Sequence, residues 1–318
     1  MTPIRARDAR DAERQLALRI ALSEPESDPY SAGKAFQMTE AFLQRCGGKV
    51  GGLHLAEASG CVLSACAVLD LPGGVGLLVL PAAAPERCRE GLGELLDLAS
   101  RSARQRGRRF VQVMLEPALV GLFEPALRQA GFDRLAILHY MQRSAYDPVA
   151  IRPVEGVNWL TLADTDEAAF AAVIQRTYID SQDCPALTGV RSMRDVLDSH
   201  RGAGPFDPLG WYLLEYEGQR AGVLITARTT VHANLDVVYV GLVPEARAKG
   251  LGRLCMHRAI QRARDLALAG VTLAVDAANR PACRLYANMG FSVYARKDVW
   301  FQVFRRADAE GMFQLPAR

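Results

Sequence analysis

The sequence has 318 residues, of which 50% are apolar and 23% are charged, with a formal net charge of +3. This length is enough for about two ordinary domains, and no apolar run reaches the roughly 18 residues that a membrane-spanning helix needs. A membrane is therefore not expected as a partner. The small net charge, with arginines spread along the chain, argues against a nucleic acid.

The N-terminal segment mixes acidic with basic residues and has no apolar core, so neither a secretory signal nor a transit peptide is predicted. The seven cysteines are odd in number and form no Cys-x-x-Cys pair, which favours reduced thiols over a disulfide framework. The five histidines have none of the spacings of a zinc site, so no metal is expected. Together these features predict a cytoplasmic protein.

In the first half, two apolar runs flank a glycine turn within residues 54–69, which predicts a β-hairpin. A further strand leads to the turn Pro85–Gly93, which opens a helix. Another strand and helix follow and end at Gly131-Phe132. Two prolines interrupt residues 146–156, where we predict a linker.

Two helix starts are indicated early in the second half. Asp164 before Thr165-Asp166-Glu167 looks like a capping box, and so does Ser192 with Asp195. The polar segment Tyr178–Arg191 lies between these two helices.

The remaining part of the second half alternates strands with helices. The expected elements are a hairpin over residues 212–227, a buried strand Val237–Val243, a helix after Gly252, a strand Val271–Val275 and a helix Pro281–Met289.

The two halves repeat one pattern at an offset of 159 residues. Pro85–Gly93 matches Pro244–Gly252, and the Gly-Phe pair that follows each helix keeps the same offset. Such self-similarity indicates a duplicated unit. The sequence therefore predicts an α/β fold of the α+β type with two tandem domains, 1–147 and 154–318, each a mostly antiparallel mixed sheet flanked by helices.

The run Val243–Gly252 joins a buried strand to the start of a helix. Gly250 and Gly252 let the main chain approach a ligand closely, and the helix start offers unpaired N–H groups to a pyrophosphate. A dinucleotide-binding turn would need a third glycine where Cys255 stands, and no P-loop pattern is present. A plain strand-to-helix turn remains the alternative.

Two motifs of the second half stand out together. They are Arg247-x-x-Gly250-x-Gly252 after a strand and a proline, and Asn279, Leu285-Tyr286 and Gly290-Phe291 downstream. In these residues the chain resembles the GCN5-related N-acetyltransferase (GNAT) superfamily. The resemblance covers roughly residues 157–304 well and the first half more weakly, and a tandem pair of this length is similar in architecture to mycothiol synthase.

The resemblance implies acetyl-CoA, or another acyl-CoA, as co-substrate and direct acyl transfer to the amine of a small molecule. It implies that the main chain at the end of the strand pairs with the pantetheine arm, that the turn amides hold the pyrophosphate, and that nearby cations and one Asn assist. The cofactor-binding residues implied are Leu242, Val243, Arg247, Ala248, Lys249, Gly250, Leu251, Gly252, Arg253 and Asn279.

The resemblance also implies catalytic residues. Tyr286 stands where family members carry a general acid, and Asp236 stands where some carry a glutamate base, so Asp236 would act through water. A core tyrosine and a solvent-facing strand-end carboxylate are the alternatives. Asn279 precedes Arg280-Pro281, so we favour a helix N-cap for it.

Segment Tyr178–Arg191 lies where the family builds its acceptor wall. Asp180 and Asp183 would favour a cationic amine and Arg191 a carboxylate, which together with Tyr178 would suit an amino-acid-like acceptor. An ordinary capped loop is an equal alternative.

The first-half residues that lie 159 positions before the proposed functional residues of the second half are of other types, so the first half is expected to lack the acid, the base and the motif arginine. Arg247, Asp236 and Tyr286 correspond to Cys88, Leu77 and Leu127. We therefore predict a degenerate first domain that pairs with the second within a monomer or a homodimer. A non-catalytic acyl-CoA sensor or scaffold is the rival function.

Overall fold

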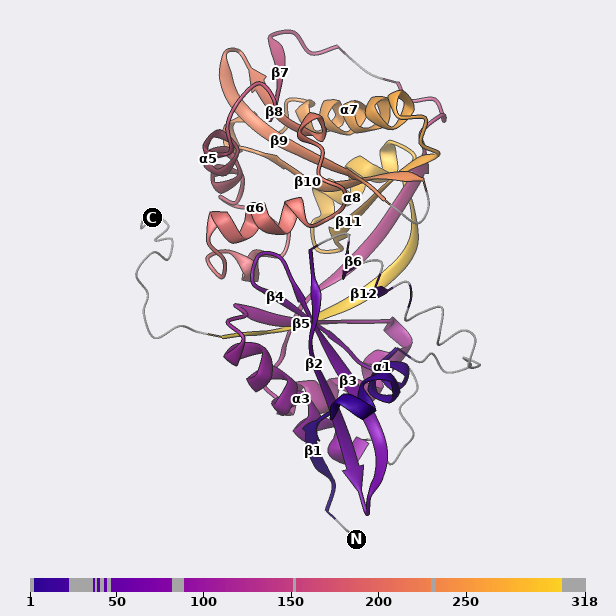
Figure 1. The fold of residues 1–318 in the computed structure, drawn as a ribbon. Coiled ribbons are helices and arrows are strands. Elements are labelled where there is room, and N and C mark those ends of the chain that lie inside the picture. Colours follow the sequence, from indigo (N-terminus) through magenta and orange to yellow (C-terminus); the bar gives the residue numbers. More distant parts are fainter. Residues whose placement is uncertain are drawn as a thin grey trace. The chain divides into compact units, whose positions relative to one another are not determined.

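A computed structural model describes residues 3–22, 37, 39–40, 43–44, 47–81, 89–150, 153–229 and 233–304. The chain divides into two compact units, one of Met1–Leu135 with Asp298–Arg318 and one of Ala136–Lys297 (Figure 1). Each unit has a mostly antiparallel sheet with flanking helices, so the predicted fold class is confirmed. No helix of the described ranges is long and apolar enough to cross a membrane.

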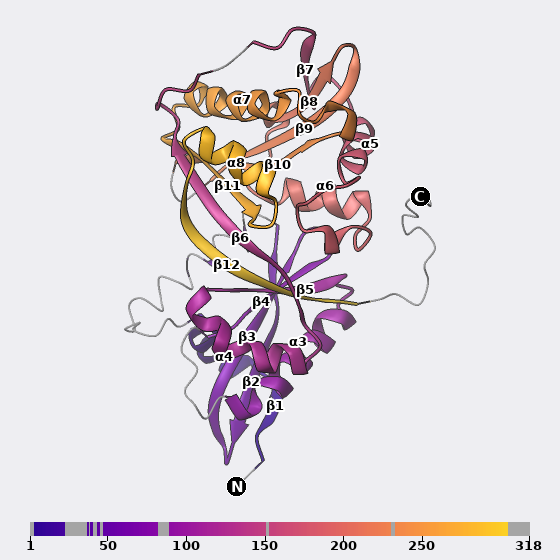
Figure 2. The ribbon, with the colours of Figure 1, turned by 180° about the vertical axis from the view of Figure 1, so that it is seen from behind.

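The first unit has a sheet in the order β1-β2-β3-β4-β5-β12, antiparallel except for the β4–β5 pair. Helices α3 and α4 lie on one face of this sheet (Figure 2), where leucines of α3 pack with Phe123 of α4 and Trp300 of β12. Helix α1 packs on the other face. Its elements are β1 (Arg5–Asp8), η1 (Asp11–Glu13), α1 (Arg14–Ala21), β2 (Lys49–Ala58), β3 (Cys61–Leu71), β4 (Val75–Val79), α3 (Arg89–Gln105), β5 (Phe110–Leu115), η3 (Pro117–Leu119), α4 (Val120–Gln129) and the end of β12 (Ser292–Val303).

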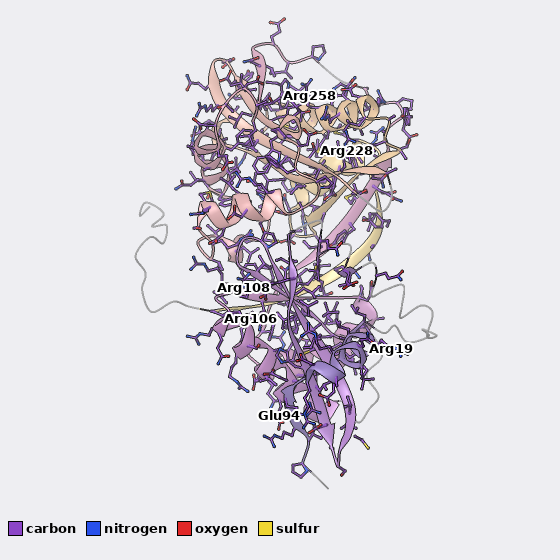
Figure 3. The ribbon with its side chains drawn as sticks, in the orientation of Figure 1. Arg19, Glu94, Arg106, Arg108, Arg228 and Arg258 are labelled. Atoms are coloured by element: carbon purple, nitrogen blue, oxygen red, sulfur yellow. The ribbon has the colours of Figure 1, made fainter. Side chains whose placement is uncertain are left out.

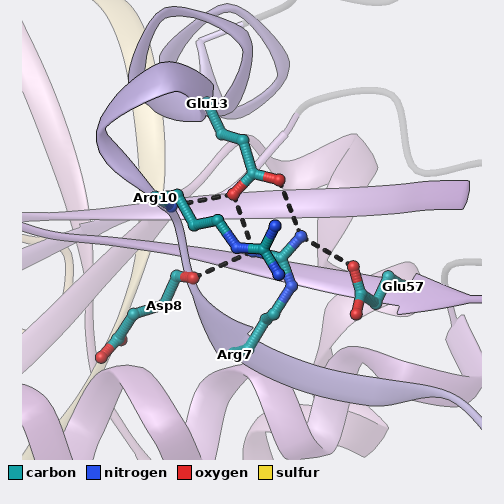
Figure 4. Close-up of polar contacts among 5 residues, drawn as sticks. All are labelled: Arg7, Asp8, Arg10, Glu13 and Glu57. Atoms are coloured by element: carbon teal, nitrogen blue, oxygen red, sulfur yellow. Dashed lines mark hydrogen bonds and ion pairs between the residues drawn. The ribbon is translucent and has the colours of Figure 1, made fainter. Parts of the chain in front are cut away.

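Ion pairs tie the edges of the first unit to its central hairpin. Arg7 of β1 donates to Glu13 of η1 and to Glu57 of β2, each at 2.7 Å (Figure 4). Arg106, which directly follows α3 and is labelled in Figure 3, donates to the buried Asp70 of β3 at 3.0 Å. These contacts hold the first strand and the end of α3 on β2 and β3.

The second unit has a sheet in the order β6-β11-β10-β9-β8-β7, in which only β10 and β11 are parallel. Its elements are β6 (Asp133–Ser144), β7 (Val157–Thr161), α5 (Glu167–Thr177), η4 (Pro185–Leu187), α6 (Met193–Arg201), η5 (Pro208–Gly210), β8 (Trp211–Tyr216), β9 (Gln219–Arg228), β10 (Asn234–Leu242), η6 (Pro244–Ala246), α7 (Leu251–Asp265), β11 (Gly270–Asp276) and α8 (Arg280–Asn288), with the start of β12.

Alternating side chains give the second sheet two covered faces. Trp211 of β8 packs under α5 and α6, whereas its neighbour Tyr212 packs under α7. Tyr286 of α8 belongs to the α7 cluster. Arg258 of α7, labelled in Figure 3, lies with its guanidinium 5.0 Å from the Tyr212 ring centroid on this face.

The sheet opens between β10 and β11. These strands pair only over Asn234–Val237 of β10, while β10 stays paired with β9 up to Leu242. A register shift between Val237 and Tyr239 bends β10 at this point. The end of β10 therefore leaves one edge without a strand partner in the described sheet.

The two units exchange their equivalent last strands. β6 and β12 start at Asp133 and Ser292, which is the offset of the sequence repeat. β6 pairs with β11 in the second unit, and residues 298–303 of β12 pair with β5 in the first. The compact units therefore do not share the bounds 1–147 and 154–318, which describe the duplicated sequence segments.

The two predicted helix starts have different outcomes. Ser192 and Asp195 form the capping box of α6 as predicted. The N-cap of α5, however, is Asp166, whose carboxylate accepts the Ala169 amide at 2.7 Å. Asp164 does not cap α5 because its carboxylate already accepts the amide and the hydroxyl of Thr161.

Candidate active site

The turn before α7 presents unpaired amides. Within the described residues, the N–H groups of Ala248 through Gly252 make no hydrogen bond, and Ala248, Lys249 and Gly250 are exposed. Positive φ angles at Ala248 (61°) and Gly250 (80°) turn the chain here. An ideal Cβ on Gly250 would meet nothing closer than Val154 at 3.9 Å. Together with the dipole of the 15-residue helix, this turn can bind an anion such as a pyrophosphate.

The edge of β10 beside this turn has room for an added strand. The Val243 amide donates to Ala221 of the β9 side at 3.0 Å, so it is already used. Because bonding alternates along an antiparallel pair, the amides of Val240 and Leu242 face the opposite edge, where no strand pairs with β10 in the described sheet. Of the two residues expected to pair with an extended ligand arm, only Leu242 has its amide on that edge.

The Arg247 side chain contacts main-chain carbonyls instead of pointing to the expected pyrophosphate position. Its guanidinium donates to the Leu242 carbonyl at 3.2 Å and to three carbonyls at the end of α5 and just beyond it, those of Thr177, Ile179 and Asp180. A cation suits the carbonyl end of a helix. The Arg247 side chain therefore joins the β10 turn to the end of α5 and does not point freely to an anion.

The other polar side chains near the turn are also held by neighbours. Lys249 Nζ lies 5.1 Å from the Tyr216 ring centroid, and Arg253 donates to the Ala150 carbonyl at 3.1 Å. Asn279 is the N-cap of α8, because its side chain accepts the Ala282 amide at 3.3 Å. Anion binding at this site therefore depends first on the main-chain amides.

A cavity of about 260 Å³ lies where β10 and β11 separate. Its wall includes Tyr286, which is 6% exposed and whose hydroxyl has no hydrogen-bond partner in the described part of the chain. Burial raises the pKa of this phenol well above its usual value, and the nearby Asp183 adds to the effect. Tyr286 is thus kept protonated and able to donate.

Asp236 lies on the other face of the sheet. Its neighbours Leu235 and Val237 belong to the cluster that contains Tyr286, so the Asp236 side chain projects away from that cluster. The Thr272 hydroxyl donates to its carboxylate at 2.9 Å. Burial raises the pKa of Asp236 to about 6, although the Thr272 bond opposes this shift. Asp236 does not line the cavity itself.

Only part of the segment expected to form the acceptor wall lines the cavity. Tyr178, Asp180 and Asp183 line the cavity. Arg191 does not; it donates to Ser199 at 3.1 Å instead. The structure therefore brings the predicted acids, but not the predicted cation, to the cavity.

Sequence reasoning missed several side chains around this wall. Tyr239 bonds to the Thr177 hydroxyl, and His200 packs on Tyr239 with ring centroids 5.1 Å apart. Burial, with Arg191 nearby, lowers the pKa of His200 to about 3. The buried Asp276 contacts the acceptor segment directly. Alternation along β10 pointed to none of them, because it would place Tyr239 on the face of Leu235 and Val237. The register shift between Val237 and Tyr239 moves Tyr239 to the α5 face instead.

Among its described residues, the first unit has no open site at the positions equivalent to the α7 turn, the gap between β10 and β11, and Tyr286. Leu127, which matches Tyr286, is fully buried in the core. A Cβ on Gly91, which matches Gly250, would lie 2.3 Å from the Ile4 side chain. β4 stays paired with β5 up to Leu78, one residue before its end. Cys88, which matches Arg247, lies outside the described residues.

The second half of the chain matches the model of the Acetyltransferase (GNAT) family over residues 177–291. The mycothiol acetyltransferase of Thermomonospora curvata is 34% identical over 249 residues, covering 76% of this chain and 79% of the relative. The mycothiol acetyltransferase of Thermobifida fusca is 29% identical over 308 residues, covering 88% of this chain and 92% of the relative.

Solved structures agree with this fold. A GCN5-related N-acetyltransferase from Sphaerobacter thermophilus has a TM-score of 0.61 at 18% identity, covering 96% of this chain and 98% of that one. A tandem GNAT protein from the clavulanic acid biosynthesis pathway has a TM-score of 0.51 at 18% identity, covering 97% of this chain and all (100%) of that one. The chain therefore belongs to the GNAT acetyltransferases as a tandem member of the mycothiol acetyltransferase type, and it is an N-acetyltransferase with acetyl-CoA as its co-substrate.

Proposed function

We propose that this enzyme transfers the acetyl group directly to a primary amine of a small molecule, and that the second unit carries the reaction. The observation that supports this most is the exposed turn of unpaired amides at the start of α7, beside the cavity that contains Tyr286. Charge-assisted hydrogen bonds contribute roughly 1.5–3 kcal/mol each, so a few such amides suffice to hold a diphosphate. Leu242 on the open edge of β10 would pair with the pantetheine arm.

In this proposal the two catalytic groups approach the reaction from opposite faces of the sheet. Asp236, acting through a water, takes a proton from the acceptor ammonium, and the free amine attacks the thioester carbonyl carbon. When the carbon–sulfur bond breaks, Tyr286 gives its proton to the leaving thiolate. The attacking nitrogen, which carries a positive charge after the attack, returns a proton to the Tyr286 phenolate through water, so that one proton in total is left on Asp236. Asp183 at the cavity wall would attract the cationic acceptor.

We further propose that the first unit is a structural partner without a working site, because its equivalents of the turn, the opening and Tyr286 are closed. The oligomeric state and the cytoplasmic location of the protein stay predictions.

The acceptor class can be identified with a thiol-release assay. Purified enzyme and acetyl-CoA are incubated with amines, amino acids, aminosugars and polyamines, and with the amine whose acetylation gives mycothiol, since the relatives carry that name. We expect amine-dependent release of coenzyme A together with an N-acetylated product. Binding of acetyl-CoA without turnover of any acceptor would favour the rival function, an acyl-CoA sensor.

The pH dependence of the reaction tests the base. A base must be deprotonated to act, and the pKa of Asp236 is raised to about 6, so kcat/KM should fall as the pH drops through about 6. Asp236→Asn should lower kcat/KM by about 10²–10⁴-fold and remove this acidic limb.

Thr272→Val is the matched control for this profile. The Thr272 hydroxyl stabilises the ionised carboxylate, so its loss should raise the Asp236 pKa and move the acidic limb to higher pH while the enzyme stays active. An acidic limb that is the same in all three enzymes would exclude Asp236 as the base.

A further inference from the structure

Residues 177–184, here called the strap, are fixed at their start by Arg247. The guanidinium donates to the Thr177 carbonyl at 3.0 Å, to the Ile179 carbonyl at 2.6 Å and to the Asp180 carbonyl at 3.4 Å. Arg247 belongs to the turn that follows β10. The start of the strap is therefore held on the β10 side of the opening.

The end of the strap is fixed by Asp276, the last residue of β11. The Cys184 amide donates to Asp276 Oδ2 at 3.3 Å, and the Asp276 amide donates to Asp183 Oδ1 at 3.1 Å. Asp276 Oδ1 also accepts the Ala278 amide at 2.9 Å, just before α8 begins. One carboxylate thus joins the strap, the end of β11 and the entry to α8.

These two attachments place the strap across the mouth of the opening. Tyr178 and Asp180 through Asp183 line the cavity between the attachments. The strap has left-handed φ angles at Asp180 (52°) and Cys184 (44°), which non-glycine residues keep only when their surroundings hold them there. Asp276 is 4% exposed and forms no ion pair with a described side chain, so the hydrogen bonds of its carboxylate are those from the Cys184 and Ala278 amides.

We propose that Asp276 is a positioning residue that locks the strap over the cavity and sets the acceptor wall against α8, the helix that carries Tyr286. The strap geometry stands by itself, whereas its role in placing the acceptor rests on the proposed function. Arg247, the arginine of the family motif, performs the equivalent task on the β10 side.

The substitution Asp276→Asn should remove the bond of the side chain to the strap but keep its bond to the entry of α8. The amide oxygen of the substituted side chain can still accept the Ala278 N–H, but its NH₂ group would face the Cys184 N–H, and two donors cannot bond. In peptide-resolved hydrogen exchange of the unliganded full chain, we expect the strap to exchange about tenfold faster or more, while α8 keeps its wild-type rate.

Kinetics with the acceptor found in the thiol-release assay give the second readout. We expect Asp276→Asn to raise KM for the acceptor about tenfold or more, with KM for acetyl-CoA within about twofold of wild type. Asp183→Ala should give the same pattern, because it removes the acceptor of the Asp276 amide while the Asp276 carboxylate stays in place.

Asp164→Asn is the control, since Asp164 also closes a turn with its carboxylate but lies outside the cavity wall. Wild-type exchange in the strap of Asp276→Asn, or an unchanged acceptor KM in both strap variants, would overturn the proposal. A failed acetyl-CoA assay would reject the proposed function alone, because the exchange measurement needs no substrate.

Discussion

Tyr286→Phe should lose about 10²–10⁴-fold in kcat with little change in acetyl-CoA affinity, the usual size of one acid–base contribution. The hydroxyl lies at the cavity wall without a hydrogen-bond partner in the part of the chain that is described, so its removal leaves no group unpaired. The ring keeps its contact with Phe291, whose centroid is 6.0 Å away. Folding stability should therefore stay near the wild-type value.

Steady-state kinetics and a thermal-shift titration with acetyl-CoA check this prediction together. Tyr146→Phe is the control, because Tyr146 is 61% exposed and does not line the cavity. A wild-type kcat for Tyr286→Phe would remove this residue from the mechanism. A loss of acetyl-CoA affinity instead of kcat would assign it a binding role.

Gly250→Val should abolish the stabilisation of the protein by acetyl-CoA. The glycine has a φ of 80°, a conformation that costs an L-residue roughly 1–2 kcal/mol and a β-branched one more. Valine would shift the backbone away from this geometry and redirect the amides on both sides. At a ligand concentration of about 100 Kd the wild type should gain about 2.7 kcal/mol, or roughly 5 °C or more in Tm.

Gly218→Val provides a control with matched strain. Gly218 has a φ of 74° in the turn between β8 and β9, and an added Cβ would meet nothing within 4 Å. We expect this variant to lose stability while keeping its response to acetyl-CoA. If Gly250→Val responds as strongly as Gly218→Val, the turn before α7 does not hold the diphosphate.

Local patterns in the sequence predicted most of the second unit. The hairpin of β8 and β9, the α6 capping box and the helix after Gly252 follow from apolar spacing, side-chain caps and glycine turns, which act over a few residues. The position of the exposed turn before α7 followed from the same rules. The α5 start was misplaced by two residues because Asp164 and Asp166 are both capable caps, and only the position of Thr161 decides between them.

Side-chain roles were harder to predict than elements. The sequence indicated Arg247 as a cation near the diphosphate, but carbonyls from a segment about 70 residues earlier engage its guanidinium (Thr177, with a separation of 70). Asp276 had no local signal at all, since its partners Asp183 and Cys184 are brought to it by the strap. Such roles depend on which carbonyls and amides meet in space.

The sequence by itself determined that the chain is a duplication and that each copy alternates strands with helices, and it predicted that Gly250 and Tyr286 belong to the copy with the chemistry. These features depend on residue types and on spacings of a few residues, which can be read directly by comparing the two halves of the sequence. Only the tertiary structure decided that β6 pairs with β11 and β12 with β5. Equivalent strands carry equivalent edges and apolar faces, so nothing local distinguishes the two sheets that each of them can join.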